Sequence, residues 1–158
     1  MRPGRRPNWL VWMRDECPEI GLNATVAPTA HLLERVQEGS LDVAILYNPP
    51  TQYGLAAELL SEEKLVLVST LKSNTIDPER YVHVDWGAAF DANLQTSYPI
   101  LAKPAVSISL GPLALSYLLS RGGLGYFRQS VVAPYVAEGH LRLIGGAPAF
   151  SYSVHAVY

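Results

Sequence analysis

Apolar residues recur along the chain with two spacings, one typical of helices and one typical of strands. Helical spacing predicts helices over residues 9–17, 29–38, 88–97, 113–120 and 130–138. Alternating or continuous apolar runs predict strands over residues 22–26, 41–47, 55–60, 64–70, 81–84, 105–110, 124–127, 141–144 and 152–158. Strands that alternate with helices are typical of parallel sheets covered by helices. The pattern therefore predicts an α/β fold.

The same order of elements occurs twice along the chain. One set spans about residues 1–67 and the other about residues 68–150, without a long linker or a low-complexity tract between them. Two such sets predict two α/β lobes that fold as one unit.

Composition narrows the functional classes. Of 158 residues, 49% are hydrophobic and 16% charged, against roughly 25% charged in an average domain. That balance excludes a disordered, collagen-like or coiled-coil protein. The net charge is -2, whereas DNA-binding domains carry a basic patch. The single Cys17 excludes an internal disulfide and a Cys-rich zinc site.

Targeting signals are weak. The apolar run 9–13 is shorter than the roughly 7–15 residues of a signal peptide. No apolar run of the sequence approaches the roughly 18 residues of a membrane span. We therefore expect a cytoplasmic protein with no membrane partner.

Candidate binding residues lie where predicted strands lead into helices. In open α/β sheets, ligands bind beyond the carboxyl ends of the strands, facing helix N-termini. Predicted strands lead into predicted helices at Thr29, at 85–87 and at 109–112. We call these junctions strand corners. A fourth corner, at 126–128, adds the rings of Tyr126 and Phe127 and the guanidinium of Arg128. Each corner also has a structural interpretation. Thr29 suits a helix N-cap, Trp86 a core aromatic and Arg128 a solvated surface charge.

Catalytic motifs are missing from the sequence. Residues 122–125 follow a predicted helix and open a strand, which is the reverse of a dinucleotide-binding fingerprint. There is no phosphate-binding loop and no nucleophile elbow. The four histidines show no metal-ligand spacing, and the pair 62–63 reads as two solvated charges. We expect no enzyme, no metal and no cofactor.

Five stretches, taken together and in order, resemble LysR-type transcriptional regulators. Residues 32–46 read LLERVQEGSLDVAIL and residues 62–68 read EEKLVLV. The other three are YVHVDWG at 81–87, GGLGYF at 122–127 and GAPAFSY at 146–152, the last followed by AVY at 156–158. The resemblance covers about residues 9–158.

The resemblance implies an effector-binding domain with two Rossmann-like lobes, as in type 2 periplasmic binding proteins, joined by crossover strands. On this basis residues 1–67 plus 152–158 form lobe I and residues 68–151 form lobe II. A small metabolite, an organic or amino acid, would bind between the lobes and control transcription. The resemblance and the strand corners together give these candidate effector contacts: Thr29, Tyr47, Asn48, Asp85, Trp86, Gly87, Ser109, Gly111, Pro112, Phe127 and Arg128.

The chain also departs from the family pattern. The DNA-binding helix-turn-helix, its linker helix and the first strand of lobe I have no counterpart, and residues 1–7 make a poor strand because of two prolines. We therefore expect a fragment of a homo-oligomeric regulator, which would reach DNA only through the missing domain. The alternatives are a stand-alone type 2 solute-binding protein and an enzyme on the same fold.

Overall fold

The computed structural model describes residues 9–158, so the expectation for residues 1–7 lies outside the described part. Its helices are α1 (Trp9–Glu16), α2 (Thr29–Gln37), α3 (Ala88–Ser97), α4 (Gly111–Arg121) and α5 (Gln129–Ala137). Its strands are β1 (Ala44–Tyr47), β2 (Ala57–Ser69), β3 (Val82–Val84), β4 (Val106–Ile108), β5 (Leu124–Arg128), β6 (Arg142–Leu143) and β7 (Phe150–Val157). Two short 3₁₀ turns, Pro78–Arg80 and Pro99–Leu101, flank β3 and α3.

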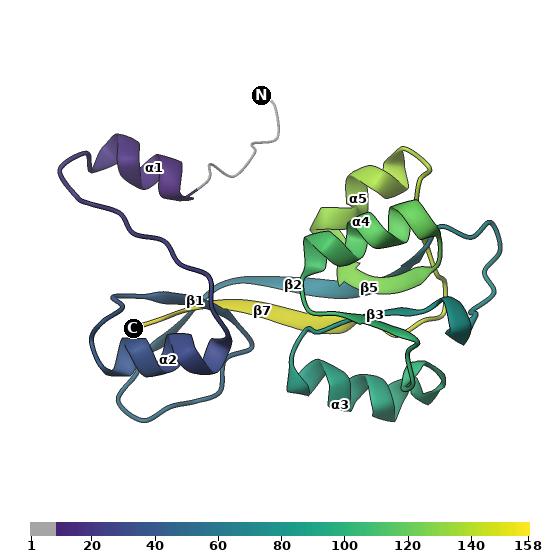
Figure 1. The fold of residues 1–158 in the computed structure, drawn as a ribbon, viewed down its shortest axis with the longest axis horizontal. Helices are drawn as coiled ribbons and strands as arrows, with labels where there is room; N and C mark the ends of the chain where they lie inside the picture. The colour runs from purple at the N-terminus through teal and green to yellow at the C-terminus, as the bar shows by residue number, and fades with distance from the viewer. Residues whose placement is uncertain (1–8) are drawn as a thin grey trace.

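Two long strands, β2 and β7, join the two halves of the molecule (Figure 1). They pair with each other in antiparallel register from Ala57↔Val157 to Leu65↔Phe150. At one end β7 also pairs with β1, and at the other end β2 pairs with β5 and β6. We call the half with α2 and β1 lobe I, and the half with α3–α5 and β3–β6 lobe II. The predicted α/β class, with two lobes and crossover strands, is confirmed.

The prediction of two separate strands at 55–60 and 64–70 is wrong, because β2 runs unbroken from Ala57 to Ser69. The pairing register shifts between Leu59 and Ser61, which marks a bulge rather than a turn. The polar residues 61–64 suggested a break, but they contain neither Gly nor Pro to end a strand. They occupy the span between the lobes, where β7 is the partner.

The prediction of parallel sheets is wrong for most of the pairing. Within residues 9–158, the parallel contacts are the β3–β4 ladder and a single bridge between Tyr81 and Leu124. All other ladders are antiparallel, because β2 and β7 cross between the lobes in opposite directions and pair with strands of both.

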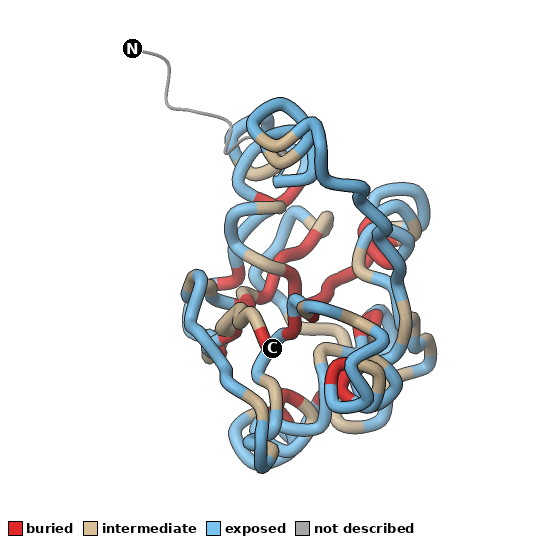
Figure 2. The backbone as a smooth tube through the Cα atoms, turned by 90° about the vertical axis from the view of Figure 1, so that its left-hand side faces the viewer, coloured by how far each residue is buried: buried red, intermediate tan, exposed pale blue. Residues whose placement is uncertain are grey.

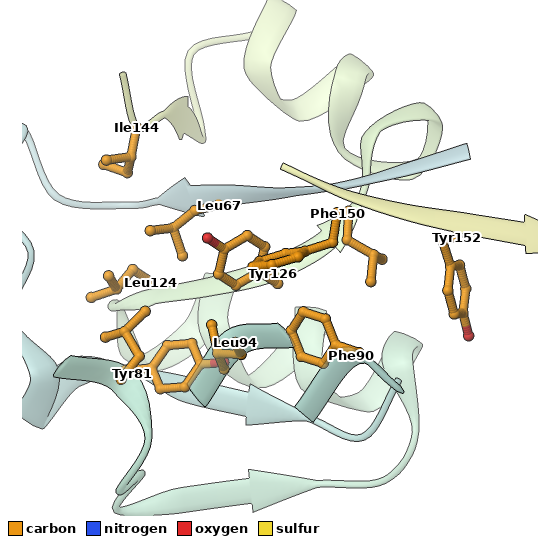
Figure 3. Close-up of a cluster of buried hydrophobic side chains, with 11 residues drawn as sticks. Leu67, Tyr81, Phe90, Leu94, Leu124, Tyr126, Ile144, Phe150 and Tyr152 are labelled. Atoms are coloured by element: carbon orange, nitrogen blue, oxygen red, sulfur yellow. The ribbon is translucent and has the colours of Figure 1, made fainter. Parts of the chain in front are cut away.

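Lobe II contains the larger part of the hydrophobic core. One of its two clusters is rich in aromatic rings (Figure 3), and Phe90, Tyr126 and Phe150 meet edge to face with centroids 5.2–5.6 Å apart. Lobe I has a smaller cluster, formed by α2, β1 and the end of β7: Leu33, Val36, Ala44, Leu46 and Val157. The residue boundaries 1–67 plus 152–158 and 68–151 stay a prediction.

The N-terminal arm, residues 9–28, stands apart from this core. Helix α1 has no buried residue, and the chain that follows it is largely exposed (Figure 2). The predicted strand 22–26 is wrong, since these residues are extended but pair with no strand of the described chain. Their alternating pattern is that of a strand, and what they lack is a partner edge.

Candidate functional site

A cavity of about 510 Å³ lies where the end of β1 meets helices α4 and α5. Six of the eleven candidate effector contacts line it: Tyr47, Trp86, Gly111, Pro112, Phe127 and Arg128. Tyr47 belongs to lobe I and the other five to lobe II. The cavity therefore lies at the junction of the two lobes.

Trp86 forms a fixed wall of this cavity. Its indole Nε1 donates a hydrogen bond to the Tyr126 carbonyl oxygen at 2.9 Å. Its rings meet Phe127 and Tyr152 edge to face, with centroids 6.5 and 5.2 Å apart. A Cβ built on Gly111 would lie 2.9 Å from Trp86 Cη2, closer than side chains pack. Glycine at the start of α4 is what lets the indole sit there.

Arg128 supplies the positive charge of the site. Its Nη1 donates to the Tyr47 hydroxyl at 3.0 Å and to Glu63 Oε2 at 3.3 Å. Its guanidinium also lies 5.7 Å from the centroid of the Tyr47 ring, within the range of a cation–π contact. The Arg128 side chain is 32% exposed. It is thus anchored by partners on both β1 and β2 rather than free in solvent.

Glu63 is the residue that the sequence reasoning interpreted wrongly. Its side chain is only 18% exposed, and its two oxygens accept hydrogen bonds from Arg128 and from the Ser130 hydroxyl. The strand alternation of β2 explains this, because Glu62 and Glu63 point to opposite faces. Glu63 therefore holds Arg128 and Ser130 in place instead of being a solvated charge.

Tyr47 connects the charged group to the aromatic core. Its ring stacks on Tyr152 with centroids 4.3 Å apart and planes 6° from parallel. Burial raises the pKa of Tyr152 well above its ordinary value, and the neighbouring Tyr47 adds to the increase. Both phenols therefore join a packed aromatic layer between the lobes.

Two helices begin beside the cavity. Helix α4 starts at Gly111 and α5 at Gln129, and neither has a side chain capping its first turn. Uncapped first-turn N–H groups and the helix dipole favour a negative charge nearby. Glu63 already offsets the Arg128 charge, so what this end of the cavity offers an anionic group is these two helix ends and the Arg128 N–H groups not used by Glu63 and Tyr47.

The remaining five candidates lie outside the cavity. Asn48 shapes the turn after β1, with its Oδ1 accepting from the Ser153 backbone N–H and hydroxyl at 3.1 and 2.8 Å. Asp85 Oδ1 accepts from the Gly87 N–H at 3.0 Å and so stabilises the loop before α3. Ser109 is exposed after β4. Thr29 is exposed too, and the N-cap of α2 is Pro28, so the N-cap interpretation of Thr29 is wrong.

Sequence reasoning missed the mostly apolar lining contributed by α4 and α5, which includes one serine. These residues are Leu115, Ser116, Leu119, Val131 and Tyr135. The pairs 115/119 and 131/135 have the i, i+4 spacing of one helix face. That signal was present, but residues 113–120 are apolar nearly all round, so it could not show which face meets a cavity.

A second polar cluster in lobe II runs from the buried Tyr81 to Asp91, whose side chain is 43% exposed. The Tyr81 hydroxyl is 3.0 Å from His83 Nδ1, and His83 Nε2 is 3.0 Å from Asp91 Oδ1, which ties β3 to α3. Tyr81 is 1% exposed, and burial raises the pKa of its phenol. The Tyr81 phenol is therefore enclosed in the core, where its contact with His83 helps to fix β3. Residues 9–158 contain no group of three or more side chains placed to hold a metal ion.

The chain has two lobes joined by crossover strands, and the guanidinium of Arg128 lines the cavity at their junction. These features define a two-lobed α/β ligand-binding domain. The family model of the LysR substrate binding domain matches residues 3–158, so the chain belongs to that family. The family has the fold of type 2 periplasmic binding proteins. No helix of the described chain is long and apolar enough to cross a membrane.

Solved structures support the fold. The bromide-bound regulatory domain of HypT from Salmonella typhimurium has 12% identity and a TM-score of 0.77, covering 94% of this chain and 78% of that one. Full-length HypT, described as a hypochlorite-specific LysR-type transcriptional regulator, has 12% identity and a TM-score of 0.77, covering 95% and 56%. Vibrio fischeri DarR in complex with DNA has 13% identity and a TM-score of 0.72, covering 87% and 51%. Comparison with curated protein sequences gave no match.

Proposed function

We propose that this domain binds a small amphipathic acid in the cavity beside Arg128 and thereby controls DNA binding by a LysR-type regulator. The observation that carries the proposal is the bond between Arg128 of lobe II and Tyr47 of lobe I at the cavity. A ligand that touches these side chains contacts both lobes at once.

The residues that line the cavity favour a ligand that is mostly apolar and carries one acidic group at its end. Leucine, valine and aromatic side chains form most of the wall, and about 510 Å³ lies within the roughly 300–1,000 Å³ of small-molecule sites. Tyr47 and Glu63 both accept from Nη1 of Arg128. A guanidinium has five N–H donors, so the donors on Nε and Nη2 can bind a ligand. A carboxylate would accept from these donors and from the first turns of α4 and α5. An organic acid or an apolar amino acid has this chemistry.

Transmission would run through β2 and β7, which connect the lobes. A ligand that binds better to one arrangement of the lobes shifts the population toward that arrangement. Thr29, Asn48, Asp85, Gly87 and Ser109 would contact the effector in a more closed arrangement. Closure would then reposition a DNA-binding domain attached to this one, within a homo-oligomer in the cytoplasm.

We propose a sensor rather than an enzyme, and no cofactor. The described lining residues of the cavity include no histidine, cysteine, aspartate, glutamate or lysine. Acid–base catalysis draws on those side chains most often. Ser116 lines the cavity, but a serine nucleophile needs an adjacent base, and these described lining residues supply none of the side chains named above. A free-standing solute-binding protein is the weaker alternative, because the family match is to the LysR domain.

Calorimetric titration of the chain with benzoate, indole-3-acetate, phenylpyruvate and leucine tests the proposal. Leu119→Trp places a large ring in the cavity, whereas Leu113→Trp changes an exposed residue of the same helix that does not line it. We expect at least one acid to bind, with affinity falling at least about tenfold, or 1.4 kcal/mol, in Leu119→Trp only. Equal binding to both variants would place the ligand elsewhere.

A further inference from the structure

The cavity at Arg128 extends along two helices. Its lining on α4 runs from Gly111 to Leu119, and its lining along α5 runs from Arg128, the residue before that helix, to Tyr135. An α-helix rises about 1.5 Å per residue, so each of these stretches is roughly 10–12 Å long. The cavity therefore reaches well past the first turn of both helices.

Both helices begin at the same end of lobe II. Strand β4 runs parallel to β3, and the bridge between Tyr81 and Leu124 is parallel too, so β4 and β5 point the same way. Helix α4 follows β4 and α5 follows β5, and the two helices cover the same face of lobe II (Figure 1). Arg128 bonds Tyr47 of lobe I at this end. The cavity therefore runs from the lobe junction outward between the helices, and we call its part lined by α4 and α5 the helix groove.

One stripe of each helix lines the groove. On α4, Pro112, Leu115 and Leu119 have the i, i+3, i+7 spacing, and on α5, Val131 and Tyr135 have the i, i+4 spacing. Residues at these spacings lie on one face of a helix, one above the other. Two such stripes that line the same space leave an elongated groove with mostly apolar walls.

Charge is confined to the junction end of the groove. Arg128 is the only lining residue with a charged side chain among those that the structure describes. Further along the described lining, the polar side-chain groups are the Ser116 hydroxyl and the Tyr135 phenol. A ligand that lies along the groove thus meets a guanidinium at one end and mainly carbon over the rest of its length.

We propose that the helix groove binds a straight-chain monocarboxylic acid of about eight to ten carbons. Its carboxylate lies at Arg128 and its methyl end lies between Leu119 and Tyr135. An extended chain advances roughly 3.3–3.6 Å for every three bonds, so the roughly 10 Å from Arg128 to Tyr135 match about nine bonds. This inference rests on the proposed function, because it names the class of acid that the same cavity binds. A short acid would fill only the junction end.

Calorimetric titration of the chain with butyrate, hexanoate, octanoate, decanoate and dodecanoate measures the length of the groove. Burial of each further methylene should raise the affinity about fourfold. We expect that rise to continue as far as decanoate. Dodecanoate should bind no more tightly than decanoate, because its last carbons pass the end of the groove.

Two matched ligands separate chain length and charge from apolar character. 2-Propylpentanoate has as many carbons as octanoate but a shorter main chain, so it cannot reach along the groove. Octan-1-ol has the chain of octanoate without the negative charge. Each should bind at least about tenfold more weakly than octanoate.

Two variants of α4 locate the chain. Leu119→Trp fills the far end of the groove, whereas Leu113→Trp changes an exposed residue of the same helix that does not line it. Leu119 is itself 36% exposed, so both variants should keep the fold. We expect Leu119→Trp to weaken decanoate binding at least about tenfold and butyrate binding less than about twofold, and Leu113→Trp to change neither.

Different results would overturn this inference and the proposed function. Equal affinities for butyrate and decanoate, or for octanoate and 2-propylpentanoate, would overturn the straight-chain acid. The proposed function would still stand if another acid bound and Leu119→Trp weakened it. An equal loss for butyrate and decanoate in Leu119→Trp would overturn the placement of the methyl end. No binding by these acids or by those named above would overturn both.

Discussion

The close approach of Gly111 to Trp86 gives a prediction that can be worked out in detail. In Gly111→Ala the new methyl would stand 2.9 Å from Trp86 Cη2. The indole cannot move away freely, because its Nε1 is bonded to the Tyr126 carbonyl and its rings meet Phe127 and Tyr152. The substitution should therefore strain this wall of the cavity.

The magnitude depends on two opposing effects. Overpacking of one methyl into a fixed site costs about 1–3 kcal/mol. Alanine gains up to about 1 kcal/mol over glycine in a helix interior, and less at the first residue of α4. The free energy of unfolding should therefore fall by about 1–2 kcal/mol.

Urea denaturation followed by far-ultraviolet circular dichroism measures this change. Gly145→Ala is the matched control, because nothing lies within 4 Å of a Cβ built there. In the Trp86→Leu background the indole is gone, so Gly111→Ala should cost close to nothing there. A cost that persists in that background, or an equal cost for Gly145→Ala, would refute the clash with Trp86.

Three further predictions concern stability. Tyr126→Phe removes the hydroxyl that donates to the Pro148 carbonyl at 2.8 Å. In urea denaturation it should lower the free energy of unfolding by about 0.5–1.5 kcal/mol. The control Tyr53→Phe changes a side chain that is 99% exposed and should leave this free energy unchanged. Leu33→Ala leaves a cavity in the small core of lobe I and should lower the free energy of unfolding by about 2–5 kcal/mol. The control Leu113→Ala changes an exposed residue and should lower it by less than about 0.5 kcal/mol. Similar losses in both variants would contradict the burial of Leu33. Burial raises the pKa of Tyr81, Tyr126 and Tyr152 above the ordinary value of 10.0, so the folded state keeps these protons longer, and its stability should be complete below pH 10 and fall as pH rises above it. Ultraviolet titration of phenolate should then show three more tyrosines ionising near pH 10 in urea than in buffer, and equal titrations would contradict the burial.

Local patterns predicted most of the elements correctly. The helices at residues 29–38, 88–97 and 113–120 and the strand at 124–127 follow from periodicity and from glycine or proline at their ends, and all occur in the structure. Partners of strands are set by contacts distant in sequence, so the antiparallel ladders of β2 and β7 could not be predicted from these local patterns. The unpaired residues 22–26 show the same limit, because a strand pattern specifies a half-buried face but not a neighbour.

The site was predicted in part for a related reason. Trp86, Gly111 and Phe127 lie at strand ends, where the geometry of α/β sheets places ligands, and the cavity is there. Glu63 was missed because its ion pair with Arg128 joins residues 65 positions apart in the chain. Tyr135 was missed because a residue in the second turn of a helix gives no sign of facing a cavity.

The most direct test of an effector cavity at the junction of the lobes uses Trp86 as the reporter. The chain has three tryptophans, and Trp9→Phe with Trp12→Phe leaves only Trp86, which lines the cavity. We predict that the acid bound in calorimetry changes the emission of Trp86 saturably, with the same affinity, and that Leu119→Trp weakens that affinity in calorimetry. Binding heat with unchanged Trp86 emission would contradict an effector site in this cavity.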